Sequence, residues 1–464
     1  LIILLYYKNA MMKNLYFLQS KKIKNMVVSA TILGLGALVT AFSPLFFGPG
    51  LSDSEPIGGF LNGNFPDYNV DNDPYEVAYE NVTFDWPLTF TPVPRGNRII
   101  VGQLDGKIYW MNNAQNTDKQ EIVDFSEEVG DAIPLNGIKE VWDGGLLGLE
   151  IHPDFGTAGK NYFYIYYTTE SETGDDTLGD GGAGTFGCDF QDFHGNYIHL
   201  ERFEVNPTDL TIVPNSREIM MRRRMLNTTH RGGGMVFGDD GYLYLATGEQ
   251  GRSINAQNIT DNLDGGVLRL DVDMNSVTSH APIRTMPADA GAQDEITGQY
   301  YFIPNDNPFN STPGVFEEYY TLGNRSPHRM TKDSETGTLY IAEVGEITHE
   351  EINVVSAGKN YGWPIWEGNI NTPNYDCGIP MLNDMPHENP LTAFDRADAS
   401  SIIGGYVYRG AEFSGTFGGK YITADWGTSK ILSVDTSSGF YETIGTLPRR
   451  PISFGQDSDG ELYY

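Results

Sequence analysis

The stretch GGMVFGDDGYLYLATG, residues 233–248, contains the pattern that decides the fold. An apolar segment is followed by Gly-Asp-Asp-Gly and then by a second apolar segment that contains Leu-Tyr. Asp and Gly tolerate the positive φ angles of tight turns, whereas Val, Phe and Tyr favour strands. The stretch therefore predicts a β-hairpin.

The same pattern recurs along the chain. A hairpin alone cannot bury both of its faces, so units of this kind must stack around an axis. We therefore predict an all-β chain whose residues 80–464 form a six-bladed β-propeller with long inter-strand loops. The other five units start at residues 98, 146, 328, 404 and 450, as RIIVGQLDGKIYWM, LLGLEIHPDFGTAGKNYFYIYYT, HRMTKDSETGTLYIAEVG, GGYVYRG with GGKYITADWGTSKILSV, and RPISFGQDSDGELYY.

The N-terminal region has the layout of an export signal. Residues 21–42, KKIKNMVVSATILGLGALVTAF, place a basic cluster before an apolar run. We expect residues 1–47 to be a signal peptide or an N-terminal membrane anchor, and residues 48–79, rich in Gly, Pro, Asp and Asn, to be an extended linker. The bulk of the chain is then exported: periplasmic, secreted, or membrane-anchored facing outside. Because the chain starts with Leu1 and stops at Tyr464 within a strand pattern, we expect it to be a fragment.

Charge and cysteine content narrow the function classes. Lys and Arg number 30 against 62 Asp and Glu, a formal net charge of −32, which disfavours a nucleic-acid partner. The charge suits divalent cations, and solubility alone is an equal explanation for it. No C-x-x-C-H motif is present, so the chain attaches no c-type haem. Cys188 and Cys377 either form a disulfide or are two unrelated thiols.

Three polar residues occupy the same position in successive repeats. Asp143, His230 and Arg325 each precede the first strand of their unit. Because loops of successive blades converge at one mouth of a propeller, we expect these side chains to lie close together. Taken singly, the histidine could be a structural loop residue, the arginine an ion-pair partner, and the aspartate a turn cap.

Residues 343–368, EVGEITHEEINVVSAGKNYGWPIWEG, mix five acidic residues with turn-forming Gly, Asn and Pro. Loop carboxylates and backbone carbonyls suit a hard cation such as calcium. The spacing is not that of an EF-hand, so composition alone carries this prediction.

Seven motifs, in order from about residue 97 to the end, resemble the soluble quinoprotein glucose/sorbosone dehydrogenases, the aldose sugar dehydrogenases that use pyrroloquinoline quinone (PQQ). The resemblance implies a six-bladed β-propeller. The motifs are GGLLGLEIHPDF, HRGGGMVFGDDGYLYLATGEQGR, GGVLRLDVD, LGNRSPHRM, EVGEITHEEINVVSAGKNYGWPIWEG, GGYVYRG and SFGQDSDGELY.

The resemblance also implies roles for single residues. His230 falls on the family's general base, and Arg325 on the arginine that contacts the quinone carbonyls. Gly345 and Glu346 fall on positions whose backbone carbonyls hold the calcium ion that polarises PQQ. A second, structural calcium is implied at Glu351 and at the carbonyl of Tyr361.

Further positions are implied around the cofactor and the sugar. Gln250 and Arg252 follow the hairpin of the base, near the sugar pocket, and Arg449 or Arg450 is expected to clamp the cofactor carboxylates. The chain departs from the better-known glucose oxidisers at Thr229, where they have Asp, at Asp143, where they have Gln, and at Ser326, where Asn is usual. We therefore expect Thr229 and Asp143 to bind a sugar other than glucose.

The predicted reaction is oxidation of an aldose C1 hydroxyl to a lactone. Neutral His230 takes the proton, calcium and Arg325 stabilise negative charge on the quinone oxygen, and electrons leave for an external acceptor, a cytochrome or a quinone. We expect the glycines that follow His230 to leave room for a flat cofactor. The alternative is a non-enzymatic, calcium-dependent carbohydrate- or protein-binding propeller at the cell surface, with a possible membrane tether.

Overall fold

The structure is a computed structural model in which the chain divides into two units, Leu1–Ser54 and Glu55–Tyr464. All described residues belong to the second unit. The predicted signal or anchor and nearly all of the predicted linker lie outside the described residues, as does Asp143. Among the helices of the described residues, none is long and apolar enough to cross a membrane. The described residues are 78–126, 128–129, 134–135, 138–139, 144–169, 188–189, 196–227, 229–285, 299–310, 312–372 and 377–464.

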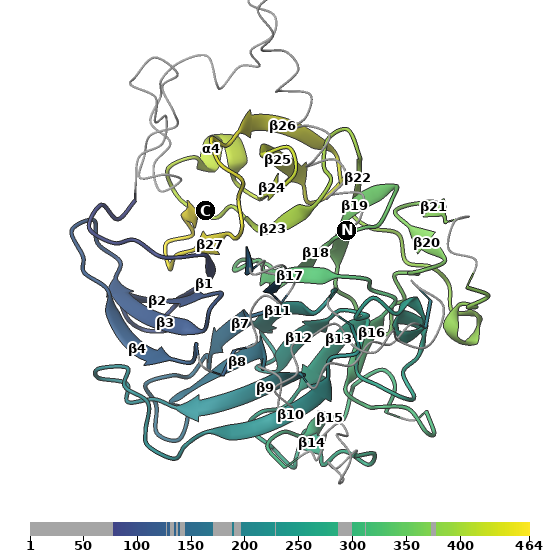
Figure 1. The fold of residues 1–464 in the computed structure, drawn as a ribbon, viewed down its shortest axis with the longest axis horizontal. Coiled ribbons are helices and arrows are strands. Elements are labelled where there is room, and N and C mark those ends of the chain that lie inside the picture. Colours follow the sequence, from purple (N-terminus) through teal and green to yellow (C-terminus); the bar gives the residue numbers. More distant parts are fainter. Residues whose placement is uncertain are drawn as a thin grey trace, which may run out of the picture. The chain divides into compact units, whose positions relative to one another are not determined.

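Five antiparallel four-stranded sheets make up most of this unit (Figure 1). In every sheet the strands pair in sequence order, as in propeller blades. Blade 1 contains β1 (Pro87–Pro92), β2 (Arg98–Gln103), β3 (Lys107–Asn112) and β4 (Gln120–Asp124), and blade 2 contains β7 (Leu146–Ile151), β8 (Tyr162–Thr168), β9 (Tyr197–Glu204) and β10 (Glu218–Arg224). Blade 3 contains β11 (Gly232–Phe237), β12 (Leu243–Thr247), β13 (Gly266–Leu270) and β16 (Tyr319–Leu322).

The remaining strands complete the ring. Blade 4 contains β17 (Pro327–Lys332), β18 (Leu339–Glu343), β19 (His349–Val354) and β22 (Thr392–Asp395). Blade 5 contains β23 (Ile402–Val407), β24 (Lys420–Asp425), β25 (Lys430–Asp435) and β26 (Tyr441–Thr446), and blade 6 is described by β27 (Gly455–Gln456) and β28 (Leu462–Tyr463). Small elements lie in the loops: β5 (Pro134–Leu135), β6 (Ile138–Lys139), β14 (Ser279–His280), β15 (Ile303–Pro304), β20 (Trp366–Glu367), β21 (Ile370–Asn371), η1 (Ser253–Gln257), η2 (Leu382–Asp384) and α4 (Ser414–Phe417).

The first strand of each blade contacts the first strand of the next. The contacts run from β1 to β7, β11, β17, β23 and β27, and from β27 back to β1. These strands surround the centre of Figure 1. The predicted all-β, six-bladed propeller is therefore confirmed, with the sixth blade represented by a two-stranded sheet.

One repeat occupies a different place from the others. Most of the quoted units are the first two strands of a blade, but the unit that starts at residue 98 is β2 with β3. The first strand of blade 1, PLTFTP, begins and ends with proline. Because proline is unusual in strands, the sequence pattern did not predict this strand. The hairpin at residues 233–248 is β11 with β12, as predicted.

Glycines let neighbouring blades approach at the centre of the ring. A Cβ added to Gly233 would lie 2.7 Å from Leu147 Cβ, and one added to Gly234 would lie 2.4 Å from the backbone nitrogen of Met330. These contacts join blade 3 to blades 2 and 4. The glycines after His230 therefore serve blade packing, and the expectation that they leave space for a cofactor is wrong at these two positions.

Arg329 spans the central channel. From blade 4, its Nη1 donates to the carbonyl of Leu147 at 2.8 Å and its Nη2 to the carbonyl of Leu88 at 2.7 Å. The guanidinium thereby joins blades 4, 2 and 1. Similar bonds from Thr91 to Leu149 and from Ser453 to Leu88 connect first-strand regions of adjacent blades.

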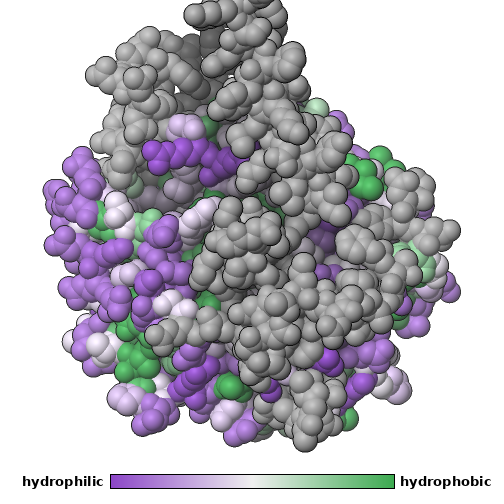
Figure 2. Space-filling model, in the orientation of Figure 1, coloured by the Kyte–Doolittle hydropathy of each residue, from purple (hydrophilic) through white to green (hydrophobic). Residues whose placement is uncertain are grey.

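The face shown in Figure 2 carries mainly hydrophilic residues wherever its residues are described. The apolar side chains are buried between the sheets, in clusters that include Leu147 and Tyr164 in one and Ile165 and Phe203 in another.

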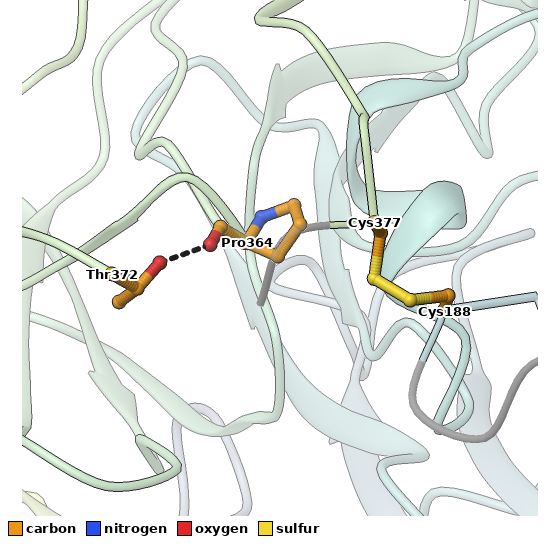
Figure 3. The surroundings of a disulfide bond; sticks show 4 residues. All are labelled: Cys188, Pro364, Thr372 and Cys377. Carbon is orange, nitrogen blue, oxygen red and sulfur yellow. Dashed lines mark hydrogen bonds between the residues drawn. A yellow bond between two sulfur atoms is a disulfide. The ribbon is translucent and has the colours of Figure 1, made fainter. Parts of the chain in front are cut away.

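Cys188 and Cys377 form a disulfide (Figure 3). Cys188 follows β8 of blade 2, whereas Cys377 follows β21 in the long insertion of blade 4. Next to Cys188 lies η1 of blade 3, whose Ile254 donates its N–H to the carbonyl of Cys188. The sequence left the pairing open, and the structure shows that the bond joins loops of blades 2 and 4 across blade 3.

Replacing both cysteines by serine should destabilise the propeller. The bond closes a loop of 189 residues, and loss of that constraint on the unfolded chain costs up to about 5 kcal/mol. Urea unfolding of the Cys188→Ser/Cys377→Ser variant, compared with the unaltered chain, measures the difference. Equal midpoints, or two reactive thiols in the denatured, unreduced chain, would contradict the pairing.

Candidate active site

The entry to each first strand lies beside the loop that joins the second and third strands. The N–H groups of Gln250, Val344 and Trp426 donate to the carbonyls of His230, Ser326 and Ser401, in blades 3, 4 and 5 respectively. In a propeller all these segments face the same mouth of the channel. The structure thus brings His230 and Arg325 to one mouth, as the repeat positions predicted.

His230 is held by a buried carboxylate. Its Nδ1 lies 2.5 Å from Oε1 of Glu249, and the two side chains are 18% and 2% exposed. His230 also has a φ of 57°, a left-handed conformation that non-glycine residues rarely adopt. With an ionised Glu249 as acceptor, Nδ1 carries the hydrogen, and Nε2 is the atom that can take a proton.

Arg325 is fixed through both its backbone and its side chain. Its N–H donates to Glu343 Oε1 at 2.7 Å, and its carbonyl accepts the N–H of Glu249 at 2.9 Å. Nη1 donates to the carbonyl of Val344 at 2.9 Å, and Nη2 pairs with the carboxylate of Glu346. The side chain is 9% exposed, and its buried Nε has no hydrogen-bond partner among the described residues.

Glu249 is a candidate site residue that the sequence did not point to. It binds the imidazole of His230 through its side chain and the carbonyl of Arg325 through its N–H, so one residue couples both candidates. Burial raises the pKa of its carboxyl to about 8, and the positive charge of Arg325 opposes the shift. The available signal was an acidic residue at a strand end, immediately before Gln250, but strand ends commonly carry such residues in turns.

Gln250 and Arg252 lie in the same loop with different surroundings. Gln250 is 1% exposed: its Oε1 accepts the N–H of Leu226, and its Nε2 donates to Asp264 at 3.0 Å. Arg252 donates to the carbonyl of Asp189, next to the disulfide, at 3.2 Å. Gln250 therefore supports the wall of the mouth, whereas the half-buried Arg252 connects that wall to the blade 2 loop.

The structure describes only some of the residues that are expected to contact the sugar. Thr229 directly precedes His230 and is half-buried, and its carbonyl accepts a hydrogen bond from Arg231 Nη1. Asp143 lies outside the described residues. Ser326 is buried, with its N–H bonded to Glu343 Oε1 at 2.5 Å.

The loop at residues 344–348 exposes carbonyls that suit a cation. The N–H groups of Glu346 and the next three residues all point at Glu367 Oε1, at 2.6, 2.9, 3.0 and 3.3 Å. In a trans peptide the carbonyl points opposite to the N–H, so the carbonyl of Gly345 faces away from Glu367. A Cβ on Gly345 would lie 1.8 Å from the carbonyl oxygen of His349, so this position requires glycine.

Oxygen-rich surroundings also mark the second expected calcium position. Glu351 lies directly opposite Glu343 on adjacent strands, and burial raises the pKa of their carboxyls to about 7 and about 8. Within the part of the chain that the structure describes, the buried side-chain oxygens of Asn324 and Asn353 accept no hydrogen bond. The backbone of Tyr361 is anchored to blade 3 through its N–H, and its hydroxyl bonds to blade 4.

The oxygen atoms at these two positions fit a hard cation, because carboxylate, amide and carbonyl oxygens are the ligands that calcium prefers. Among the described residues, no group of three or more His, Cys, Asp or Glu side chains is arranged to hold a metal. Calcium at either position would therefore take most of its ligands from backbone carbonyls, amide oxygens, the cofactor or water.

The two candidate clamp arginines have different positions. Arg450 lies over the ring of Trp426, 4.1 Å from its centroid, where blades 5 and 6 reach the mouth. Arg449 lines a cavity of about 340 Å³ between blades 1 and 6, beside Tyr79 and Phe454. The structure thus brings Arg450, rather than Arg449, to the mouth that holds His230.

Comparisons with known proteins agree with this geometry. The family model described as glucose/sorbosone dehydrogenase matches residues 84–297 and 284–463. The HIPL2 protein of Arabidopsis thaliana is 26% identical over 93% of this chain and 64% of its own length. The aldose sugar dehydrogenase YliI of Escherichia coli is 30% identical over 64% of this chain and 63% of its own length.

A further relative and a solved structure are also similar to this chain. The human Hedgehog-interacting protein is 25% identical over 71% of this chain and 41% of its own length. A PQQ-bound aldose sugar dehydrogenase from Streptomyces coelicolor has a similar structure, with a TM-score of 0.52 and 19% identity over 82% of this chain and 87% of that one.

The chain spans about three fifths of the length of the first relatives given above, at 64% and 63%. Structural similarity at this level of identity establishes the fold, while the family model covers well over half of the chain. The chain therefore belongs to the glucose/sorbosone dehydrogenase family.

Proposed function

We propose that this chain is a PQQ-dependent dehydrogenase that oxidises the C1 hydroxyl of an aldose to the lactone and passes the electrons to an external acceptor, a cytochrome or a quinone. The observation that carries the proposal is the pairing of His230 with buried Glu249, beside Arg325, at one mouth of the channel. This arrangement provides a base, a carboxylate that orients it, and a fixed cation.

The residues present fit the cofactor and its calcium ion. Arg325 has a buried Nε without a partner, and the carbonyls of Gly345 and Glu346 have no donor among the hydrogen bonds of the described residues. Arg450 at the same mouth is a further cation for a carboxylate of the cofactor. PQQ, when bound, supplies the acceptor for the hydride that leaves C1 of the sugar.

His230 performs the proton transfer. Its Nε2 takes the proton of the C1 hydroxyl while Glu249 holds Nδ1–H and stabilises the imidazolium that forms. Arg325 is kept beside the reacting groups by the N–H of Glu249 and by Glu343. Thr229 and Asp143 are the residues proposed to read the sugar, since neither repeats the residue of the better-known glucose oxidisers.

The setting of the reaction is part of the proposal. The basic and apolar residues 21–42 support export, with the enzyme periplasmic, secreted or tethered to a membrane. The disulfide supports an oxidising compartment.

A second candidate function is calcium-dependent binding of a carbohydrate or protein at the cell surface, without redox chemistry. The relative named Hedgehog-interacting protein supports this class, as does the departure from the usual residues at Thr229. Uptake of PQQ distinguishes the two, because only the enzyme needs it.

Reconstitution tests the proposal directly. The chain is incubated with PQQ and calcium, PQQ uptake is followed by absorbance, and dye reduction is measured with a panel of aldoses. We expect stoichiometric uptake and reduction with at least one sugar. Calcium binding with neither uptake nor reduction would favour the binding module.

Replacing His230 by alanine should abolish turnover and leave PQQ bound. Removal of a general base costs roughly 10²–10⁴-fold in rate. The reconstituted His230→Ala variant is compared with His280→Ala, which changes a histidine in β14, outside the mouth. Full activity in His230→Ala would remove this residue from the mechanism.

Activity should rise with pH through the titration of Glu249. Its pKa is raised to about 8, so at lower pH the neutral carboxyl binds Nδ1 as a donor and leaves the hydrogen on Nε2. We therefore expect kcat/KM to fall as the pH drops below about 8.

Glu249→Gln should remove this pH dependence and lower kcat by roughly 10⁴-fold, because an amide cannot stabilise the imidazolium as a carboxylate does. Activity profiles from pH 5.5 to 9.5 for both proteins measure the effect. An unchanged profile in the variant would show that another group titrates.

A further inference from the structure

The guanidinium of Arg325 binds the turn at residues 344–346 through both of its terminal nitrogens. Nη1 donates to the carbonyl of Val344 at 2.9 Å, and Nη2 pairs with Oε2 of Glu346. Between these contacts lies Gly345, whose carbonyl is an expected calcium ligand. Glu346 therefore follows an expected calcium ligand directly in the chain, and its side chain is bound to the fixed cation of the mouth.

Glu346 differs from the other carboxylates around this loop. Glu343 accepts two backbone N–H groups and the amide of Asn324, and Glu351 accepts the N–H of Gly368 and the amide of Asn353. Glu367 accepts four backbone N–H groups. These three carboxylates are locked by the backbone, with side chains that are almost completely buried.

The hydrogen bonds and ion pairs of the Glu346 carboxylate, within the part of the chain that the structure describes, are limited to its pairing with Arg325. Its side chain is 31% exposed, whereas that of Arg325 is 9% exposed. The backbone below it is fixed, because its own N–H donates to Glu367 at 2.6 Å. The backbone of Glu346 is therefore rigid, whereas its carboxylate can exchange Arg325 for another partner.

Charge is the reason why this carboxylate would strengthen calcium binding. A divalent cation on the carbonyls of Gly345 and Glu346 would lie near the guanidinium of Arg325, and two cations in a partly buried site repel each other strongly. A carboxylate shared between them offsets the repulsion, and its oxygens are themselves preferred calcium ligands.

We propose that the Glu346 carboxylate is a positioning residue shared between Arg325 and the calcium ion: it holds the guanidinium over the turn at residues 344–346 and strengthens calcium binding there through its negative charge. The inference rests on the proposed function and adds a side chain to a site for which the family resemblance implied only the backbone carbonyl of this residue.

Calcium titration of the PQQ-free chain by calorimetry tests the proposal without any turnover. Glu346→Gln keeps the size of the side chain and removes its charge, and we expect the calcium dissociation constant to rise at least tenfold. Glu346→Asp should recover part of the loss. The matched control is Glu442→Gln, which removes one charge from an exposed pair with Lys420 on blade 5 and should change the constant less than twofold.

The other half of the ion pair gives a result of opposite sign. Arg325→Met removes the repelling cation and releases Glu346, so calcium binding should become tighter. A merely structural role for the pair would weaken binding in both variants.

The outcomes separate the two proposals. If the unaltered chain binds PQQ and calcium, and Glu346→Gln binds calcium as tightly, the role of Glu346 is overturned and the proposed function stands. If the unaltered chain binds neither PQQ nor calcium, both are overturned. Thermal unfolding of each variant without calcium verifies that the fold is intact.

Discussion

The candidate site depends on Glu249, a buried carboxylate that binds His230 with its side chain and Arg325 with its backbone. A carboxylate that is 2% exposed is costly to ionise, and burial accordingly raises its pKa. The positive charge of the nearby Arg325 guanidinium offsets part of that cost. Base, orienting group and cation are therefore linked through a single residue at the junction of blades 3 and 4.

The propeller supplies the rigidity that this linkage needs. At Gly233 and Gly234, blade 3 lies so close to its neighbours that a Cβ would not fit. Arg329 joins blades 4, 2 and 1 across the channel. The left-handed backbone of His230 is held by the bond from the N–H of Gln250 to its carbonyl. Strain of this kind persists only where the surroundings over-determine it, and it is common at functional sites.

The architecture and the site were predictable from the sequence to different degrees. A turn of Asp and Gly between two apolar strands, found in five units and joined by one related strand pair, was sufficient to predict the all-β propeller, and the six units agree with six blades. His230 and Arg325 occupy equivalent positions in successive repeats, and this was sufficient to predict that they lie at the same mouth of the channel. The strand flanked by Pro87 and Pro92 was missed because proline is unusual at strand positions and masks the repeat.

What the sequence could not provide was the partner of each acidic residue. Composition alone made residues 343–368 a calcium-binding stretch, yet Glu343 and Glu367 accept backbone N–H groups and hold the loops in place. Glu249 resembled a turn residue for the same reason. Partner choice depends on which loops of different blades meet at the mouth, and no local pattern contains that information.

The most direct test of the central claim is the protonation state of His230 in the PQQ-free chain. The chain has eight histidines, so ¹⁵N-histidine labelling with a His230→Gln spectrum for assignment is practical. Above the titration of Glu249 we predict a neutral ring with hydrogen on Nδ1 and an unprotonated Nε2. A ring with hydrogen on Nε2 at that pH would contradict the role of Glu249 and of His230 as the base.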